Sequence, residues 1–407
     1  MTGHHHVMGA LATSDARAVA GWLAAREDEM VETLTRLASV ESPSGWRPGL
    51  EEAAVVVSDE LAASGLRPRT GGGDATVWVL GRPDGGARPR SYQLVLGHLD
   101  TVWPVGTLER MPVRREGGRL HGPGVFDMKG GIVQLVYALR ALDAVGLAPS
   151  AAPVVLLTGD EEVGSRQSRG LITRLAGLAC RAFVLEPSFG SRGALKVARK
   201  GVGRFEVRIK GRAAHAGIDP GQGVSAILEA SHQIQSIDAL NDPERGVTVN
   251  VGTVEGGMRP NVVAPEASVV VEARTRRLDD ARAVERALRA LTTALDGTTI
   301  EVSGGFGRPP MEQTPGGSRL LALAKEAGHL LGSPIEGASV GGASDGNLIA
   351  GLVPVLDGLG AVGDGAHADH EHVVVSTLPE RAALLAMLLA APLDTPRPAD
   401  EPPEPPR

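Results

Sequence analysis

Residues 92–104 read "YQLVLGHLDTVWP", an apolar run that ends in a histidine and an aspartate two positions apart. The run has the length and apolar content of a buried strand, so this polar pair falls where the strand ends. Side chains alternate along an extended chain, and therefore His98 and Asp100 can point the same way. Such a pair suits a metal ligand with the carboxylate that orients it, but it equally suits a polar strand-to-loop junction.

Further apolar runs follow in alternation with helix-like stretches. "GGIVQLVYALRALDAV" at 130–145 has helical character, whereas "PVVLLT" at 153–158 and "AFVLEP" at 182–187 read as short buried strands. This alternation predicts an α/β domain with a mostly parallel sheet between helices. In open sheets of this class, ligands collect at the carboxyl ends of the strands, so the polar residues there are candidates for a functional site.

A second pattern begins near residue 197. "GRFEVRIKG" at 203–211 and "EASVVVEARTR" at 266–276 alternate apolar and polar residues, as is typical of a sheet with one solvent-facing side. The earlier pattern then resumes, which predicts one discontinuous domain interrupted by a smaller α+β domain. The predicted boundaries are 13–196 with 306–393 for the first domain and 197–305 for the second.

Composition narrows the classes of function. A chain of 407 residues exceeds the usual span of one core, which favours two domains. With 41 basic and 48 acidic residues, a net charge of -7 and no basic stripe, nucleic acid is not an expected partner. Cys180 is the only cysteine, so any metal site must use His, Asp and Glu.

The chain ends and hydropathy bear on location. We find neither a leader-like N-terminus nor an apolar run long enough to span a bilayer, and we expect a cytoplasmic protein without a membrane partner. Segments 1–12 and 394–407 are predicted to be a flexible terminus and a disordered tail. The tract His4–His6 is interpreted as a cloning remnant or part of a disordered end.

Four later loops also carry ionisable residues. They are Asp127 in "HGPGVFDMKGG", Glu161 and Glu162 in "TGDEEVGS", Glu186 in "FVLEP", and His367, His370 and His372 in "AHADHEHVV". Each alone has an ordinary alternative as a helix cap, a turn carboxylate or part of a solvated loop. Together with His98, however, they offer enough imidazoles and carboxylates to hold two divalent ions. A neighbouring carboxylate that is not a ligand, such as Glu161, can then take a proton from a metal-held water.

The order of these motifs resembles a known family. "GHLDTV", "GPGVFDMKGG", "DEEVGS", "EP", "GRAAHAG" and "AHADHEHV" together are similar to the zinc-dependent exopeptidases, over about residues 15 to 395. That family contains glutamate carboxypeptidases, aminoacylases, succinyl-diaminopimelate desuccinylases and acetylornithine deacetylases, and the first of these branches is the most similar. The resemblance implies a di-metal hydrolase.

The resemblance also implies a ligand set for two Zn²⁺ ions per subunit, with Co²⁺ or Mn²⁺ as alternatives. One ion would be held by His98, Asp127 and Glu186, and the other by Asp127, Glu162 and His367, so that Asp127 bridges them. The family has a cis peptide bond after this bridging aspartate. Its spacing of a histidine, three residues and a glutamate selects His367 with Glu371, and leaves His370 and His372 with a structural or a pocket role.

Further roles are implied by the same likeness. Asp100 would orient His98, and Glu161 would be the general acid and base. His215 in "GRAAHAG" would reach the active site of a partner subunit to stabilise the oxyanion, which implies a homodimer. Asn250 in "TVNVG" would assist the same oxyanion.

The implied reaction is hydrolysis of an amide beside a free carboxylate in a small substrate such as a dipeptide. Candidate carboxylate binders are Arg308, whose fork can bind both oxygens, and the donors of Gly341, Gly342 and Ser344. Phe306 stands where the glutamate carboxypeptidase branch has an arginine, which argues against a preference for a terminal glutamate. The alternatives are an amidohydrolase that acts on N-acyl amino acids and a non-catalytic relative that keeps the fold for binding.

Overall fold

The computed structural model describes residues 12–83 and 91–393, which divide into two compact units with separate hydrophobic cores. Unit 1 comprises the residues up to Val197, Gln313–Ala338 and the residues from Ile349 onwards. Unit 2 comprises Ala198–Glu312 and Ser339–Leu348. The tract His4–His6, the rest of the predicted N-terminal segment before Ala12, and the predicted tail at 394–407 lie outside the described residues.

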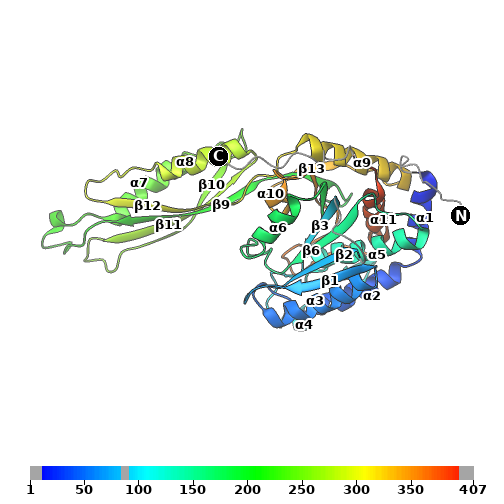
Figure 1. The fold of residues 1–407 in the computed structure, drawn as a ribbon. Coiled ribbons are helices and arrows are strands. Elements are labelled where there is room, and N and C mark those ends of the chain that lie inside the picture. Colours follow the sequence, from blue (N-terminus) through cyan, green and yellow to red (C-terminus); the bar gives the residue numbers. More distant parts are fainter. Residues whose placement is uncertain (1–11, 84–90, 394–407) are drawn as a thin grey trace. The chain divides into compact units, whose positions relative to one another are not determined.

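Unit 1 is built on a six-stranded sheet in the order β1-β2-β6-β3-β7-β14 (Figure 1). Its strands are β1 (Leu66–Gly71), β2 (Trp78–Pro83), β3 (Tyr92–His98), β6 (Ala152–Thr158), β7 (Arg181–Val184) and β14 (Val355–Leu356). The strands β6, β3, β7 and β14 run parallel to one another, whereas β2 is antiparallel to both β6 and the edge strand β1. The central strand β3 is buried along its whole length, as expected for a strand covered on both faces. The predicted α/β class with a mostly parallel sheet is therefore confirmed.

Helices lie around this sheet (Figure 1). They are α1 (Thr13–Ala24), α2 (Glu27–Ala38), α3 (Arg47–Ala62), α4 (Thr107–Arg110), α5 (Gly130–Val145), α6 (Arg169–Ala176), α9 (Pro315–Leu331) and α11 (Thr377–Ala390). Helices α5 and α11 are apolar on nearly all sides, because they pack against each other and against other helices. A Cβ on Gly131 would lie 2.2 Å from the carbonyl oxygen of Leu185, so this glycine lets α5 approach the segment that leads to Glu186.

A smaller sheet in unit 1 joins two loops that are distant in sequence. Its order is β15-β16-β5-β4, with strands β4 (Arg114–Glu116), β5 (Arg119–His121), β15 (Gly363–Asp364) and β16 (His372–Val374). Because β5 pairs with β16, the loop that leads to Asp127 is anchored beside the loop that contains His367. Two further strands, β8 (Leu195–Arg199) and β13 (Gly337–Val340), pair with each other, and α10 spans Gly346–Ile349.

Unit 2 is an antiparallel sheet with two helices on one face (Figure 1). The strand order is β10-β11-β9-β12, with β9 (Gly201–Lys210), β10 (Thr248–Gly256), β11 (Glu266–Thr275) and β12 (Thr299–Arg308). The helices are α7 (Ala226–Asp238) and α8 (Leu278–Arg289), and a short 3-10 turn spans Pro220–Gln222. Along β9, Phe205, Val207 and Ile209 are buried while Arg204 and Arg208 are exposed, which is the predicted alternation. Among the described residues of both units, no helix is long and apolar enough to cross a membrane.

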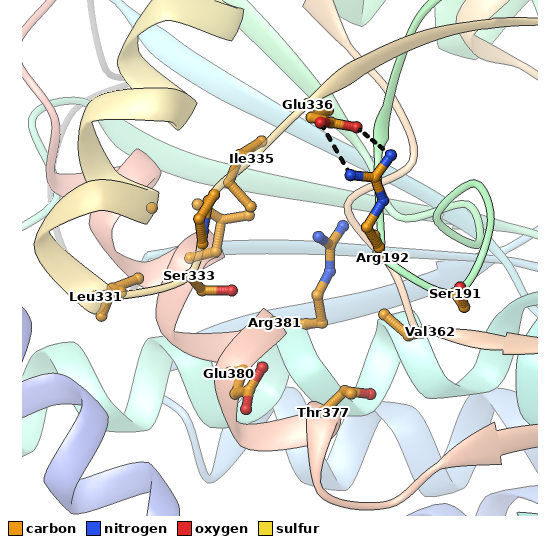
Figure 2. Close-up of a pocket in the computed structure, with 13 residues that line it drawn as sticks. Ser191, Arg192, Leu331, Ser333, Ile335, Glu336, Val362, Thr377, Glu380 and Arg381 are labelled. Carbon is orange, nitrogen blue, oxygen red and sulfur yellow. Dashed lines mark hydrogen bonds and ion pairs between the residues drawn. The ribbon is translucent and has the colours of Figure 1, made fainter.

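A cavity of about 360 Å³ in unit 1 lies beside the end of α9 and the start of α11 (Figure 2). Arg381 lines it and is only 5% exposed. Its Nε, Nη1 and Nη2 donate to the backbone carbonyls of Gly360, Gly193 and Gly358 at 3.1, 2.8 and 2.6 Å. Burial lowers the pKa of Arg381 to about 10, so the side chain stays charged at neutral pH. The cavity is lined by none of the predicted site residues, and Arg381 joins two backbone segments there, one at Gly193 and the other at Gly358 and Gly360.

Replacement of Arg381 by methionine is expected to lower the free energy of unfolding by about 3 kcal/mol. Three buried carbonyl groups lose their donor, and a buried acceptor without a partner is costly. Arg192→Ala is the matched control, because Arg192 lines the same cavity and, among the residues that the structure describes, its side chain forms only an exposed ion pair with Glu336 (Figure 2). That change is expected to be below about 1 kcal/mol. Urea denaturation measures both, and equal effects would contradict this account of Arg381.

Candidate metal centre

Three adjacent parallel strands carry most of the candidate ligands at one edge of the sheet in unit 1. His98 is the last residue of β3, and Glu186 follows β7 by two residues. Glu161 and Glu162 follow the end of β6. Because neighbouring parallel strands end at the same edge, these side chains meet although they come from separate parts of the sequence.

Asp127 reaches the same edge from an irregular turn at Val125–Lys129. Gly124, just before this turn, has a φ of 71°, which a residue with a side chain rarely adopts. The peptide bond between Asp127 and Met128 is cis, as the family resemblance implied.

Each carboxylate oxygen of Asp127 faces a different histidine. Nε2 of His98 lies 3.3 Å from Oδ1 of Asp127 and 3.6 Å from Oε1 of Glu186. Nε2 of His367 lies 3.5 Å from Oδ2 of Asp127 and 3.2 Å from Oε2 of Glu162. The structure thus brings the five predicted ligands together as two groups that share Asp127.

The donor atoms of this cluster fit a divalent cation. Nε2 of His98, Oδ1 of Asp127 and Oε1 of Glu162 are buried and have no hydrogen bond to any described residue. Buried polar atoms are nearly always hydrogen-bonded, so the convergence of these atoms without such bonds indicates a site for a cation. Imidazole nitrogen with carboxylate oxygen is a ligand set that suits zinc and related metals.

The charges of the cluster favour the same interpretation. Burial alone would lower the pKa of His98, but the carboxylates of Asp100 and Asp127 outweigh it and raise this pKa well above its ordinary value. Asp127 and Glu162 raise the pKa of His367 to about 10. Although burial opposes it, His367 and His98 hold the pKa of Asp127 far below its usual range. Carboxylates outnumber imidazoles here, and a bound cation would balance the excess negative charge.

Glu161 has two geometrically permitted roles. It is only 6% exposed, and one of its carboxylate oxygens lies within 4.8 Å of ligand atoms of both His98 and Glu186. It can therefore act as a ligand of one ion or as the base beside it. The two roles predict different metal contents after substitution, which a measurement can separate.

Asp100 contacts His98 mainly through its main chain. Nδ1 of His98 lies 2.9 Å from the backbone oxygen of Asp100 and 3.5 Å from its Oδ1. The carboxylate accepts the backbone N–H groups of Glu161 and Glu162 at 3.2 and 3.1 Å and the hydroxyl of Ser44 at 2.6 Å. Asp100 thus fixes both the imidazole and the backbone of the glutamate pair. The hydrogen bond from Ser44 could not be predicted from the local sequence, because Ser44 lies 56 positions before Asp100.

The three late histidines lie in different surroundings. His367 has a φ of 61° in the left-handed region, and its ring faces Asp127 and Glu162. His370 is exposed, whereas His372 is buried in β16 with its ring centroid 5.2 Å from that of His121. Of the three, His367 is the one directed at the carboxylate cluster.

The two predicted oxyanion donors lie in unit 2. Nδ1 of His215 accepts the backbone N–H groups of Gly217 and Ile218 at 3.1 Å, so a neutral ring carries its proton on Nε2 and can donate from there. His215 is exposed, and Asn250 is exposed on the edge strand β10.

The predicted carboxylate binders also lie in unit 2. Nη2 of Arg308 lies 3.2 Å from Oδ1 of the buried Asp345. Arg274 and Arg199 donate to the carbonyls of Gly341 and Gly342 at 3.1 and 3.2 Å. These contacts hold the glycine-rich loop to strands β11 and β8.

Two further residues of unit 2, Ser344 and Phe306, bear on the predicted carboxylate-binding site. Oγ of the buried Ser344 accepts the backbone N–H of Gly346 at 3.0 Å. The ring of Phe306 meets that of Phe205 edge to face, with centroids 5.9 Å apart, and packs on the core of unit 2. Phe306 is therefore a packing residue and offers no charge to a ligand.

Comparisons with known proteins bear out the resemblance. A model described as "Peptidase family M20/M25/M40" matches residues 94–391. Carboxypeptidase G2 of Pseudomonas sp. (strain RS-16) is 30% identical over 370 residues, which cover 88% of each chain. Aminopeptidase PepT from Bacillus cereus has a similar fold, with a TM-score of 0.73, 22% identity, and coverage of 89% of this chain and 98% of that chain. The YXEP protein of Bacillus subtilis, a dinuclear metal-binding peptidase, has a TM-score of 0.64 at 14% identity, with coverage of 90% and 98%.

Proposed function

Since the chain belongs to peptidase family M20/M25/M40 and is a metal-dependent hydrolase of amide or peptide bonds, we propose that it uses two zinc ions to cleave such a bond beside a free carboxylate. One observation carries this proposal: the two oxygens of Asp127 face two different imidazoles, and each imidazole has a second carboxylate of its own. A relative named carboxypeptidase G2 supports the free carboxylate, and a neighbour titled dinuclear supports the pair of ions. The cytoplasmic location stays a prediction from the sequence.

In this proposal His98, Asp127 and Glu186 hold one ion, and Asp127, Glu162 and His367 hold the other. Two divalent ions bound there would polarise the scissile carbonyl and lower the pKa of an attacking water towards about 7. Asp100 keeps the ring of His98 and the backbone of Glu162 in place through the contacts described above. Cobalt or manganese remain alternatives to zinc, because the ligand atoms are the same.

Glu161 moves the proton. It takes one proton from the attacking water and then delivers it to the nitrogen of the leaving amine, so that water and the amide become a carboxylic acid and an amine. His215, with its proton on Nε2, and the amide of Asn250 donate to the oxyanion that develops on the carbonyl. Burial of Glu161 keeps bulk water from competing for this proton.

The substrate's own carboxylate is assigned to Arg308 with donors from Gly341, Gly342 and Ser344. Arg308 must share its guanidinium between the substrate and Asp345, which fixes the direction of the fork. Phe306 packs into the core of unit 2 and carries no charge, so it cannot pair with a second carboxylate on the side chain of a substrate. A strict preference for a C-terminal glutamate is therefore not expected. Hydrolysis of N-acyl amino acids is the second candidate function.

The proposed function is tested on metal-free protein that is reloaded with zinc or cobalt and incubated with dipeptides and N-acyl amino acids. Mass spectrometry should detect hydrolysis that stops when a chelator is added. Matched substrates with an amidated C-terminus are the control, and they should resist cleavage because the carboxylate is blocked. A protein that binds two ions but cleaves neither class would be a non-catalytic relative.

We further propose that unit 2 serves as a dimerisation and lid domain that binds a second copy of this chain. The strand β10 is at the edge of its sheet, and an open edge is a natural pairing surface. Ile227 and Leu228 on the adjacent helix α7 are 48% and 51% exposed, and Val254 on β10 and Met258 just after it are 57% and 76% exposed. Apolar side chains grouped beside an open edge favour self-association.

If His215 acts in the partner's site, two inactive variants should rescue each other. His215→Ala alone is expected to lower kcat by about 10²- to 10³-fold through the loss of an oxyanion donor. When the His215→Ala and Glu161→Ala proteins are mixed, dimers with one subunit of each kind should form. In such a dimer one active site combines an intact Glu161 with an intact His215 from the other subunit, and this site should be active. Sedimentation checks the dimer. An active monomer, or a mixture without rescue, would rule out action in trans.

A further inference from the structure

The side chain of Glu371 is a junction between the loops that carry Asp127 and His367. It is fully buried, and it lies four residues after His367. Oε1 accepts the backbone N–H groups of Phe126 and Asp127 at 2.9 and 3.1 Å. Oε2 accepts the backbone N–H of Gly124 at 2.9 Å and the indole N–H of Trp103 at 2.8 Å.

The main chain of Glu371 strengthens this junction. Its carbonyl accepts the N–H of Gly122 at 3.3 Å, and its own N–H donates to the carbonyl of Ala368 at 2.9 Å. The turn that presents His367 is therefore closed on itself and bound to the segment before Asp127. Gly124, which donates to Glu371, needs to be a glycine for two reasons. Its φ is in the left-handed region, and a Cβ there would lie 2.6 Å from Cγ2 of Thr101.

Only a carboxylate satisfies these four donors together. An ionised carboxyl group is purely an acceptor, with two oxygens that can each take two hydrogen bonds. Glutamine has nearly the same shape but replaces one oxygen by an NH₂ group, so two of the four N–H groups would face another donor. Such a mismatch in a buried site is costly, and the chain relieves it by moving the loop.

We propose that Glu371 is a positioning residue that sets the distance between the two groups of ion-holding side chains by locking the Asp127 loop to the His367 loop. The inference rests on the proposed di-metal function and assigns a part of that site that binds neither ion. Asp127 is shared by both groups, so a shift of its backbone displaces both oxygens relative to His98 and His367. Residues that orient metal ligands in this way commonly change metal affinity by about 10- to 100-fold when replaced.

The test is cobalt binding to metal-free protein, followed by the absorption spectrum of the bound ion and by stoichiometry. Glu371→Gln should weaken cobalt binding by about 10- to 100-fold and change the spectrum. Asp369→Asn is the matched control, because it removes one negative charge from the same loop, where the exposed side chain of Asp369 forms its one ion pair within the described part of the chain with Arg110. The control should bind two cobalt ions with the wild-type spectrum.

A second variant keeps the test decisive if Glu371→Gln does not fold. Trp103→Phe removes one of the four donors and keeps an aromatic ring, so it should weaken cobalt binding in the same direction but by less than about tenfold. If Glu371→Gln folds and binds cobalt with wild-type affinity and spectrum, the inference is wrong, even if the thermal stability of the variant is lower. If Glu371→Gln does not fold, the same result for Trp103→Phe would overturn the inference. Wild-type protein that bound no cobalt would instead overturn the proposed function, and this inference with it.

Discussion

Glu161→Gln is expected to lower kcat by about 10⁴-fold while the protein keeps two ions per subunit. The estimate is at the upper end for general acid–base catalysis, because the same side chain is proposed to accept the proton and to deliver it. Glutamine keeps the size of the buried side chain and its backbone contact with Asp100, so the loop should stay in place. Steady-state kinetics and metal analysis of the same sample measure the two quantities together.

The neighbouring residue supplies the matched control. Glu162→Gln is the same substitution one position along, at a side chain whose Oε2 lies 3.2 Å from Nε2 of His367. It should reduce the metal content, whereas Glu161→Gln should not. Loss of an ion from Glu161→Gln would show that Glu161 is a ligand in the group with His98 and Glu186, which the distances also permit.

Asp127→Asn is expected to abolish hydrolysis and to reduce the metal content from two ions to fewer than one per subunit. Asparagine has one oxygen and one NH₂ group, so one of the two directions that face His98 and His367 loses its acceptor. Both groups depend on this single residue, and each ion also loses the negative charge that balances it. Atomic absorption after dialysis measures the metal content.

Two controls separate the shared role from a general loss of charge. Asp143→Asn makes the same change at an exposed position on α5 and should leave activity and metal content unchanged. Glu186→Gln alters only the group around His98 and should leave about one ion bound. If Asp127→Asn retained two ions, Asp127 would not be the bridge.

The residues that gather at the sheet edge could be predicted from sequence because each follows an apolar run. His98 ends β3, Glu186 follows β7, and the glutamate pair follows β6, so parallel order alone brings them together. The position of Asp127 rests on a motif between glycines, and its meaning came from the family resemblance. The comparisons confirm that resemblance over most of the chain.

The contacts that hold these residues in place could not be predicted in the same way. The carboxylate of Asp100 binds backbone groups 61 and 62 positions later, and Glu371 binds donors between 244 and 268 positions earlier. Such hydrogen bonds depend on how loops pack after folding, and no periodicity or local spacing encodes them. The strand-end pair and the family spacing single out Asp100 and Glu371 in the sequence, but neither indicates that these side chains are buried or which donors they bind.

The division into two units separates two properties that natural selection acts on. Every side chain proposed to hold an ion belongs to unit 1, whereas the proposed oxyanion donors and carboxylate binders belong to unit 2. Substitutions in unit 2 can therefore change which amide is accepted while the ion-holding residues stay as they are. Related enzymes with this division can acquire new substrates while they retain the same metal-binding residues.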